Sequence, residues 1–172
     1  KLNTFILTSL YYIRIMKLKK ENVWDYPRPA IYQKHTGLIE VIVNNNTIAR
    51  SNRAFRVIET SHPPTYYFPP EDVKIDFLKK NKNSSFCEWK GEASYLDLYL
   101  NKIKIPNIAW FYSSPIKEFQ AIKNFISFYA SKAEKCIVNG ELVINQDGDF
   151  YGGWITKNLK GPFKGSIETL DW

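Results

Sequence analysis

Cysteine is scarce in this 172-residue chain, in which only Cys87 and Cys136 occur. Two cysteines so far apart provide neither a CxxC zinc knuckle nor the disulfide framework of a small secreted domain, so a reducing compartment is the simpler expectation. The two histidines, His35 and His62, do not complete a tetrahedral metal site. We therefore expect no zinc and no other cofactor.

The chain also lacks an apolar run that is long enough to cross a membrane. Residues 5–15 fall far short of the roughly 20 residues of a spanning helix, and Arg14 interrupts them. Residues 1–20 contain five basic residues and no acidic one, and they include the only methionine, Met16. We expect residues 1–20 to be a basic leader outside the fold, either a targeting remnant or an extension without function. Residues 21–172 are expected to form one domain.

The formal net charge of +7 would ordinarily point to nucleic acid as a partner. Once the leader is set aside, however, 19 basic residues stand against 17 acidic ones. The sequence has no arginine-rich run and no helix with basic periodicity. Nucleic acid is therefore not an expected partner.

Apolar residues make up 44% of the chain and aromatic residues 16%, which suits one globular core. From Glu21 onward, short runs of alternating apolar residues are separated by Gly, Asn and Pro, and this pattern predicts an all-β domain. Strands are expected at residues 39–43, 47–50, 53–59, 86–100, 103–105, 108–112, 125–129, 136–138 and 141–144. Asn44-Asn45-Asn46 and Asn139-Gly140 are typical of the turns of β-hairpins.

Three other segments complete the expected fold. Ser114 and Pro115 resemble the start of one short helix that ends near Asn124. Residues 73–78 should be short and amphipathic, whereas the polar residues 79–85 should form an exposed loop. Residues 23–29 should be an extended N-terminal arm, and the Gly- and Trp-rich tail should pack across a sheet.

Two proline pairs frame the segment from Ser61 to Val73. Because proline lacks an N–H group, this segment cannot be a central strand, yet its aromatic residues are too apolar for an ordinary solvated loop. We expect it to clamp the edge of a sheet and to form the rim of a binding pocket. His62 at this rim is interpreted either as bonded to the backbone or as a catalytic base.

The side-chain alternation of the predicted 86–100 strand raises a question about two charges. In an unbroken strand, Lys90 and Glu92 share a face with three leucines, and buried charges must be paired or must line a cavity. The alternative is a bulge at Gly91 that returns both charges to water. Glu59 ends a similar apolar row one strand earlier. Cys87 lies near Lys90 and is either a reactive thiol or inert packing.

Several motifs occur in an order that resembles the domain-of-unknown-function family numbered 427. They are Val23-Trp24-Asp25-Tyr26-Pro27-Arg28-Pro29, Glu59-Thr60-Ser61-His62-Pro63-Pro64, Trp89-Lys90-Gly91-Glu92-Ala93-Ser94-Tyr95, Ala109-Trp110-Phe111-Tyr112 and Val138-Asn139-Gly140-Glu141. The resemblance implies a β-tent fold, two antiparallel sheets that meet at an angle, shared with methionine sulfoxide reductase B and the thalidomide-binding domain of cereblon. The tail, Asp149 to Thr156, looks like the cyanobacterial and plastid version, which implies a cyanobacterial cytoplasm or a plastid stroma.

This family is sometimes labelled a nucleotidyltransferase, a reaction that ordinarily needs metal-binding carboxylates and a phosphate cradle. The chain has Asp72 and Asp76 at near-strand spacing. It has no GxGxxG or GK[ST] loop and no obvious carboxylate triad, so the label is the weakest of the functional hypotheses.

The preferred hypothesis is a domain that binds an unidentified small molecule, with enzymatic activity left open and no catalytic residue assigned. Aromatic walls with a few converging charges are typical of ligand sites. The candidate ligand-binding residues are Glu59, His62, Tyr66, Tyr67, Trp89, Lys90, Glu92, Tyr95 and Trp110. The alternative is a protein-interaction subunit of a larger, for example photosynthetic, assembly, in which the aromatic residues fill the core and the tail docks on a protein partner.

Overall fold

The computed structural model describes residues 19–169 and 171–172. Most of the leader lies outside these residues, so the expectation for it is not addressed. The strands are β1 (Glu21–Asn22), β2 (Ile31–Lys34), β3 (Ile39–Val43), β4 (Asn46–Ser51), β5 (Phe55–Glu59), β6 (His62–Tyr67), β7 (Leu78–Cys87), β8 (Gly91–Leu100), β9 (Ile103–Phe111), β10 (Ile126–Phe128), β11 (Lys135–Val138), β12 (Glu141–Leu142), β13 (Ile144–Asn145), β14 (Trp154–Ile155) and β15 (Leu159–Lys160). Short 3-10 helices are η1 (Val23–Asp25), η2 (Pro70–Asp72), η3 (Ile75–Phe77), η4 (Lys117–Ile122) and η5 (Ile167–Thr169).

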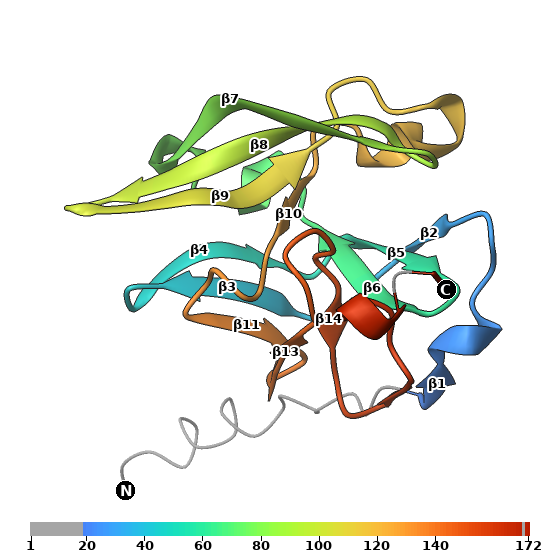
Figure 1. Ribbon diagram of the computed structural model, residues 1–172. Helices are drawn as coiled ribbons and strands as arrows, with labels where there is room; N and C mark the ends of the chain where they lie inside the picture. The colour runs from blue at the N-terminus through green and yellow to red at the C-terminus, as the bar shows by residue number, and fades with distance from the viewer. Residues whose placement is uncertain (1–18, 170) are drawn as a thin grey trace, which may run out of the picture.

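The all-β prediction is confirmed. The main sheets are antiparallel, with strand orders β10-β9-β8-β7, β12-β11-β3-β4 and β2-β5-β6, while β13-β14 and the parallel pair β1-β15 are two-stranded. Figure 1 shows the β7–β9 strands as one layer above the other sheets, with β10 crossing between the layers. Strand β10 pairs with β9 and also bridges to the lower layer, where Phe68 and Ile126 exchange backbone hydrogen bonds of 2.8 and 2.9 Å.

The predicted hairpin turns are present. Asn44 and Asn45 join β3 to β4 with φ values of 48° and 59°, and Asn139-Gly140 joins β11 to β12 with φ values of 51° and 80°. Successive positive φ angles match the right-handed twist of the paired strands, and asparagine and glycine tolerate them best. The local turn chemistry therefore determines these two hairpins.

The predicted helix is present as the 3-10 helix η4, which begins at Lys117 rather than at Pro115 and has no side-chain N-cap. Phe119 and Ile122 are buried as expected, whereas Ile116 remains exposed. Phe119 has a φ of −113° and interrupts the helical backbone. The sequence pattern therefore predicted which side chains of this segment are buried, but it did not predict the start or the type of the helix.

Two strand assignments were wrong. The predicted exposed loop 79–85 belongs to β7, and the predicted single strand 86–100 is divided by a turn at residues 88–90 that joins β7 to β8. Strand β7 lies at the edge of its sheet and carries exposed lysines, which is a common way to protect an edge from further pairing. Residues 73–78, expected to be amphipathic and short, contain η3.

The proline-rich rim forms the edge strand β6 of the β2-β5-β6 sheet. Pro63 and Pro64 are both buried within it, where an edge strand tolerates their missing N–H groups. The proline-rich segment was expected to pack against the edge of a sheet, but its first part is the edge strand itself. No helix in the described part of the chain combines the length and the apolar character needed to cross a membrane.

The hydrophobic core has two main parts. The larger part packs β3, β4, β8, β9, β10 and β11 around Phe68, Phe128 and Trp154. The smaller part is an aromatic cluster under η4 that includes Tyr67, Trp110 and Tyr112. This second cluster borders the cavity described next.

Candidate functional site

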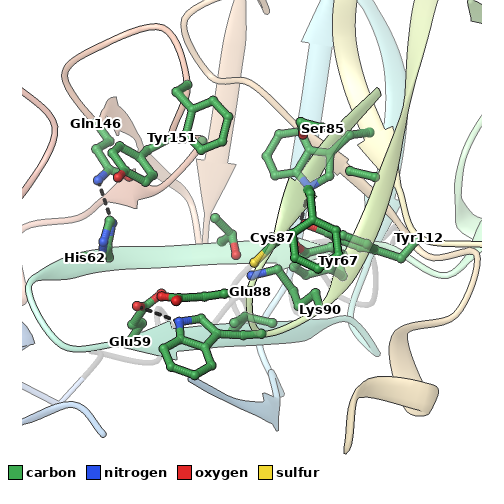
Figure 2. A pocket seen from close by; sticks show the side chains of 18 of the residues that line it. Glu59, His62, Tyr67, Ser85, Cys87, Glu88, Lys90, Tyr112, Gln146 and Tyr151 are labelled. Carbon is green, nitrogen blue, oxygen red and sulfur yellow. Dashed lines mark hydrogen bonds between the residues drawn. The ribbon is translucent and has the colours of Figure 1, made fainter. Parts of the chain in front are cut away.

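A cavity of about 370 Å³ lies between the β5–β6 strands and the β7–β9 sheet, and the chain after β13 covers one side of it. Figure 2 shows the charged and aromatic side chains that point into it. Seven of the nine candidate residues line this cavity: Glu59, His62, Tyr67, Trp89, Lys90, Tyr95 and Trp110. The structure thus brings together residues from β5, β6, β8, β9 and the β7–β8 turn.

Tyr66 is not part of the cavity. Side chains alternate along β6, so Tyr66 faces away from its neighbour Tyr67. Its ring is buried in the larger core, with ring centroids 5.2 Å from Trp154 and 5.1 Å from His35. Tyr66 is therefore a core residue and not the predicted residue of the pocket wall.

Glu92 is not part of the cavity either, because it is exposed on β8. The predicted alternation fails because the turn ends at Lys90 and β8 begins at Gly91, which has a φ of +95°. Lys90 therefore belongs to the turn and points inward independently of the strand's alternation, while Glu92 points outward. The unbroken strand predicted correctly that Lys90 is buried, and the bulge predicted correctly that Glu92 faces water.

Lys90 is only 9% exposed and reaches into the cavity floor. Its backbone is held on both sides, since its N–H donates to Cys87 O at 3.2 Å and its C=O accepts from Ile116 N at 3.2 Å. Its Nζ lies 5.9 Å from the centroid of the Tyr112 ring and 5.8 Å from that of Phe119. Within residues 19–169 and 171–172, no carboxylate lies within 4.0 Å of this nitrogen.

The charge state of Lys90 follows from its neighbours. Burial lowers the pKa of Lys90, but the acidic side chains around it, Tyr67 and Cys87 first among them, outweigh burial and leave the pKa above its usual value. Figure 2 shows the Lys90 ammonium and the Cys87 sulfur side by side. At neutral pH the cavity floor therefore contains an ammonium ion.

Glu59 and Trp89 form a second polar element in the cavity wall. The indole Nε1 of Trp89 donates to Glu59 Oε1 at 2.8 Å (Figure 2). The guanidinium of Arg28 lies 5.9 Å from the Trp89 ring and 3.6 Å from the Glu88 carboxylate. Both members of the Arg28–Glu88 pair are more than half exposed, so this pair contributes little to stability.

His62 is held by Gln146, not by the backbone. The amide nitrogen of Gln146 lies 3.1 Å from His62 Nδ1 and, because an amide N–H₂ only donates, Nδ1 must accept. The same Gln146 side chain donates to Lys164 O at 2.6 Å and accepts from Gly153 N at 3.0 Å. Burial, with the positive charges of Lys164 and Lys90, lowers the pKa of His62 to about 4. His62 is therefore neutral near pH 7 and a weak base.

Tyrosine hydroxyls supply the remaining polarity of the cavity. Tyr67 accepts from Trp110 Nε1 at 3.4 Å, and Tyr95 Oη lies 2.8 Å from Ser85 Oγ. Burial is the largest cause that raises the pKa of Tyr112 and of Tyr129. These two phenols are therefore neutral, and they can exchange hydrogen bonds with a ligand without adding charge.

Sequence reasoning missed several lining residues from the ends of the domain. They are Arg28, Gln146, Phe150, Tyr151 and Lys164. One signal was present: Gly152 lies against Trp110, where an added Cβ would be 2.2 Å from the ring, so only glycine lets the tail approach this wall. The Tyr151-Gly152-Gly153-Trp154 run marked this close approach.

In the part of the chain that the structure describes, no three His, Cys, Asp or Glu side chains converge as a metal site would require. No curated protein matches the chain. The profile of one family, described as "Domain of unknown function (DUF427)", matches residues 31–139. This match covers more than half of the chain and confirms the resemblance seen in the motifs, so the protein belongs to the DUF427 family.

Proposed function

We propose that this protein binds a small molecule in the cavity between β5–β6 and β7–β9. One observation carries the proposal: Lys90 is a buried ammonium that faces a cavity of about 370 Å³, and among the described residues no carboxylate lies within 4.0 Å of it. Burial disfavours the charged form of a lysine, and the neighbours that offset burial here do not form an ion pair with it, so a direct partner for the ammonium is still open. A ligand in the cavity would supply that partner.

The cavity walls support the proposal. Ligand sites are mostly apolar and aromatic, with a few polar groups that fix orientation, and their volumes are roughly 300–1,000 Å³. Trp89, Trp110 and Tyr151 provide such walls, while Glu59 and His62 provide fixed polar groups. The arrangement supports binding of a compact ligand.

A protein-interaction role has less support. Trp154 of the aromatic tail is fully buried and donates to Phe128 O at 2.9 Å, so it does not present a docking surface. Trp24 is half-exposed, but its indole donates to Pro162 O at 2.8 Å and its ring packs against Trp172. Trp24 and Trp172 therefore stabilise the contact between the N-terminal arm and the tail.

Nucleotidyl transfer also has little support. The Asp72 carboxylate is occupied by a bidentate bond from Arg53, at 3.0 and 2.8 Å, which leaves it poorly available for a metal ion. Asp76 is exposed on η3 and does not line the cavity.

The test is metabolite capture on purified protein, read by native mass spectrometry. Wild-type protein should retain a small molecule from cell extract, and Lys90→Met should lose it because the ammonium is gone while the side-chain length is kept. Lys102→Met, in the exposed β8–β9 turn, is the matched control and should behave as wild type. Equal capture by Lys90→Met, together with Lys90 reacting with an amine reagent as fast as Lys102, would contradict the proposal.

A further inference from the structure

Resting on this proposed function, we infer the class of the ligand: a monoanion with a planar aromatic body, whose carboxylate pairs with Lys90 and whose ring lies between the aromatic walls. The inference depends on three properties of the cavity: its one unpaired buried cation, the acidic side chains on its walls, and its aromatic lining.

The first property is the sign of the charge at the cavity floor. The Nζ of Lys90 is buried near the rings of Tyr112 and Phe119, with centroids 5.9 and 5.8 Å away, and Cys87 lines the cavity beside it. Because Lys90 is held as an ammonium, it is a poor nucleophile toward a carbonyl group and a good partner for an anion. The floor therefore favours a carboxylate over an aldehyde or ketone that would form a Schiff base.

The second property limits the ligand to one negative charge. Three cationic side chains line the cavity, but Arg28 is paired with Glu88, and Lys164 donates to the main-chain oxygen of Trp172. Glu59 also lines the cavity and would repel additional negative charge. A nucleoside triphosphate would carry several negative charges past this carboxylate with one free ammonium to receive them. A single carboxylate matches the single open charge.

The third property is the shape of the lining. The rings of Trp110 and Tyr129 pack with centroids 4.5 Å apart, and Tyr151 packs edge-on against His62 at 4.6 Å. These rings are held by packing and by hydrogen bonds, so they offer fixed flat surfaces that contact an aromatic ring at little entropic cost. The cavity volume, near the lower end of the usual range, suits one or two fused rings.

The experiment uses two pairs of probes that differ only in charge: indole-3-acetate with indole-3-acetamide, and benzoate with benzamide. Binding to the full chain is measured by isothermal titration calorimetry and by ligand-observed NMR. At least one acid should bind about tenfold or more tightly than its amide, as expected for a charge-assisted bond at a buried site. Lys90→Met should abolish this preference, while Lys102→Met should preserve it. ATP, with or without Mg²⁺, should bind more weakly than the preferred acid.

The cysteines provide an independent readout of where the acid binds. Cys87 lines the cavity beside Lys90, whereas Cys136 is buried in the larger core at 2% exposure. Saturating acid should slow the reaction of Cys87 with a thiol reagent several-fold and leave the rate at Cys136 unchanged. Protection of neither cysteine by a bound acid would place that acid outside the cavity and overturn the inference.

The two proposals fail in different ways. If extract yields a captured metabolite that Lys90→Met loses, but the metabolite is neutral, cationic or multiply charged, the proposed function stands and the inference is wrong. If an amide binds as tightly as its acid, or if no probe binds at all, the inference is also wrong. If nothing is captured from extract and no probe binds, both are wrong.

Discussion

Two cations of this protein, the partly buried Arg56 on β5 and the buried Lys90 in the β7–β8 turn, have opposite surroundings. Arg56 Nη1 contacts Glu21 at 2.9 Å, and its Nε and Nη2 donate to Gln33 Oε1 at 3.2 and 2.9 Å. Tyr26 completes this network by donating to the other Glu21 oxygen at 2.7 Å. Lys90 lies near aromatic rings and Cys87, and in the described part of the chain no carboxylate lies within 4.0 Å of it. The first cation links β1 to β5 through an ion pair, and the second faces the cavity.

The largest effect should come from breaking the Arg56 network. Arg56→Met should lower the free energy of unfolding by about 3 kcal/mol, because it leaves the mostly buried Glu21 carboxylate, 18% exposed, without its partner. Urea unfolding followed by tryptophan fluorescence measures this change. Arg50→Met removes a mostly exposed arginine that pairs with Glu40, and it should cost less than about 1 kcal/mol. Equal costs for the two variants would remove the structural role assigned to Arg56.

The second effect is a loss of stability at acid pH, which follows from the burial of the two histidines. The folded-state pKa of His62 and of His35 is about 4 in each case, below the ordinary 6.5, and burial is the largest cause. The unfolded chain therefore binds protons at a higher pH than the folded chain does. Stability should be complete above about pH 6.5 and should fall as the pH drops toward 4, by roughly 2–3 kcal/mol for each histidine.

Unfolding measured between pH 7 and 4 checks this sign. His62→Gln should flatten the decline, since the variant loses the group that gains a proton on unfolding. His35, whose buried Nε2 lacks a partner among the described residues, should contribute an equal share. A decline that is unchanged in both His62→Gln and His35→Gln would show that other groups cause it.

A smaller effect should follow from straining the turn that positions Lys90. Gly91 has a φ of +95°, and the nearest atom to an added Cβ is 3.7 Å away, so Gly91→Ala introduces backbone strain rather than a clash. The cost should be about 1–2 kcal/mol. Gly140→Ala, at a φ of +80° with no neighbour within 4 Å, is the matched control. The two variants should lose similar free energies of unfolding. Only Gly91→Ala should change the rate at which Cys87 reacts with a thiol reagent.

The smallest effect on stability should come from removing Lys90 itself. Lys90→Met should change the free energy of unfolding by less than about 1 kcal/mol, because burial disfavours the ammonium while its neighbours favour it, and an apolar chain of similar length fills the same space. Thermal unfolding of the ligand-free protein measures this. A loss comparable to that of Arg56→Met would show that Lys90 has an unrecognised structural partner, and the contrast between the two cations would disappear.

The sequence predicted local features more reliably than register. Asn44-Asn45 and Asn139-Gly140 specify their turns through their own backbone preferences, so these hairpins could be predicted. The turn at residues 88–90 could not be predicted, because Glu88 and Trp89 give no turn signal and only Gly91 interrupts the alternation. The polar sequence of β7 predicts a loop, because an exposed edge strand needs no apolar face that would reveal it.

The candidate site shows the same limit. Tyr67 belongs to one predicted segment of the site, and Trp89 and Lys90 belong to another. The fold places all three residues in one cavity. Tyr66 and Glu92 were misplaced because a shift of one residue along a strand moves a side chain to the opposite face. Gln146 and Lys164 were missed since their positions depend on a tail contact that is remote in sequence from His62.

The tail contact divides the cavity into two parts with separate origins in the chain. The floor around Lys90 comes entirely from the segment that matches the DUF427 profile, residues 31–139, whereas Arg28 and the lining residues between Gln146 and Lys164 lie outside it. Gly152 lets this outer segment rest against Trp110. A protein with the same inner segment but a different tail would keep Lys90 and change the part of the cavity lining that the tail contributes. The charge of the cavity and the shape of its lining could then diverge independently.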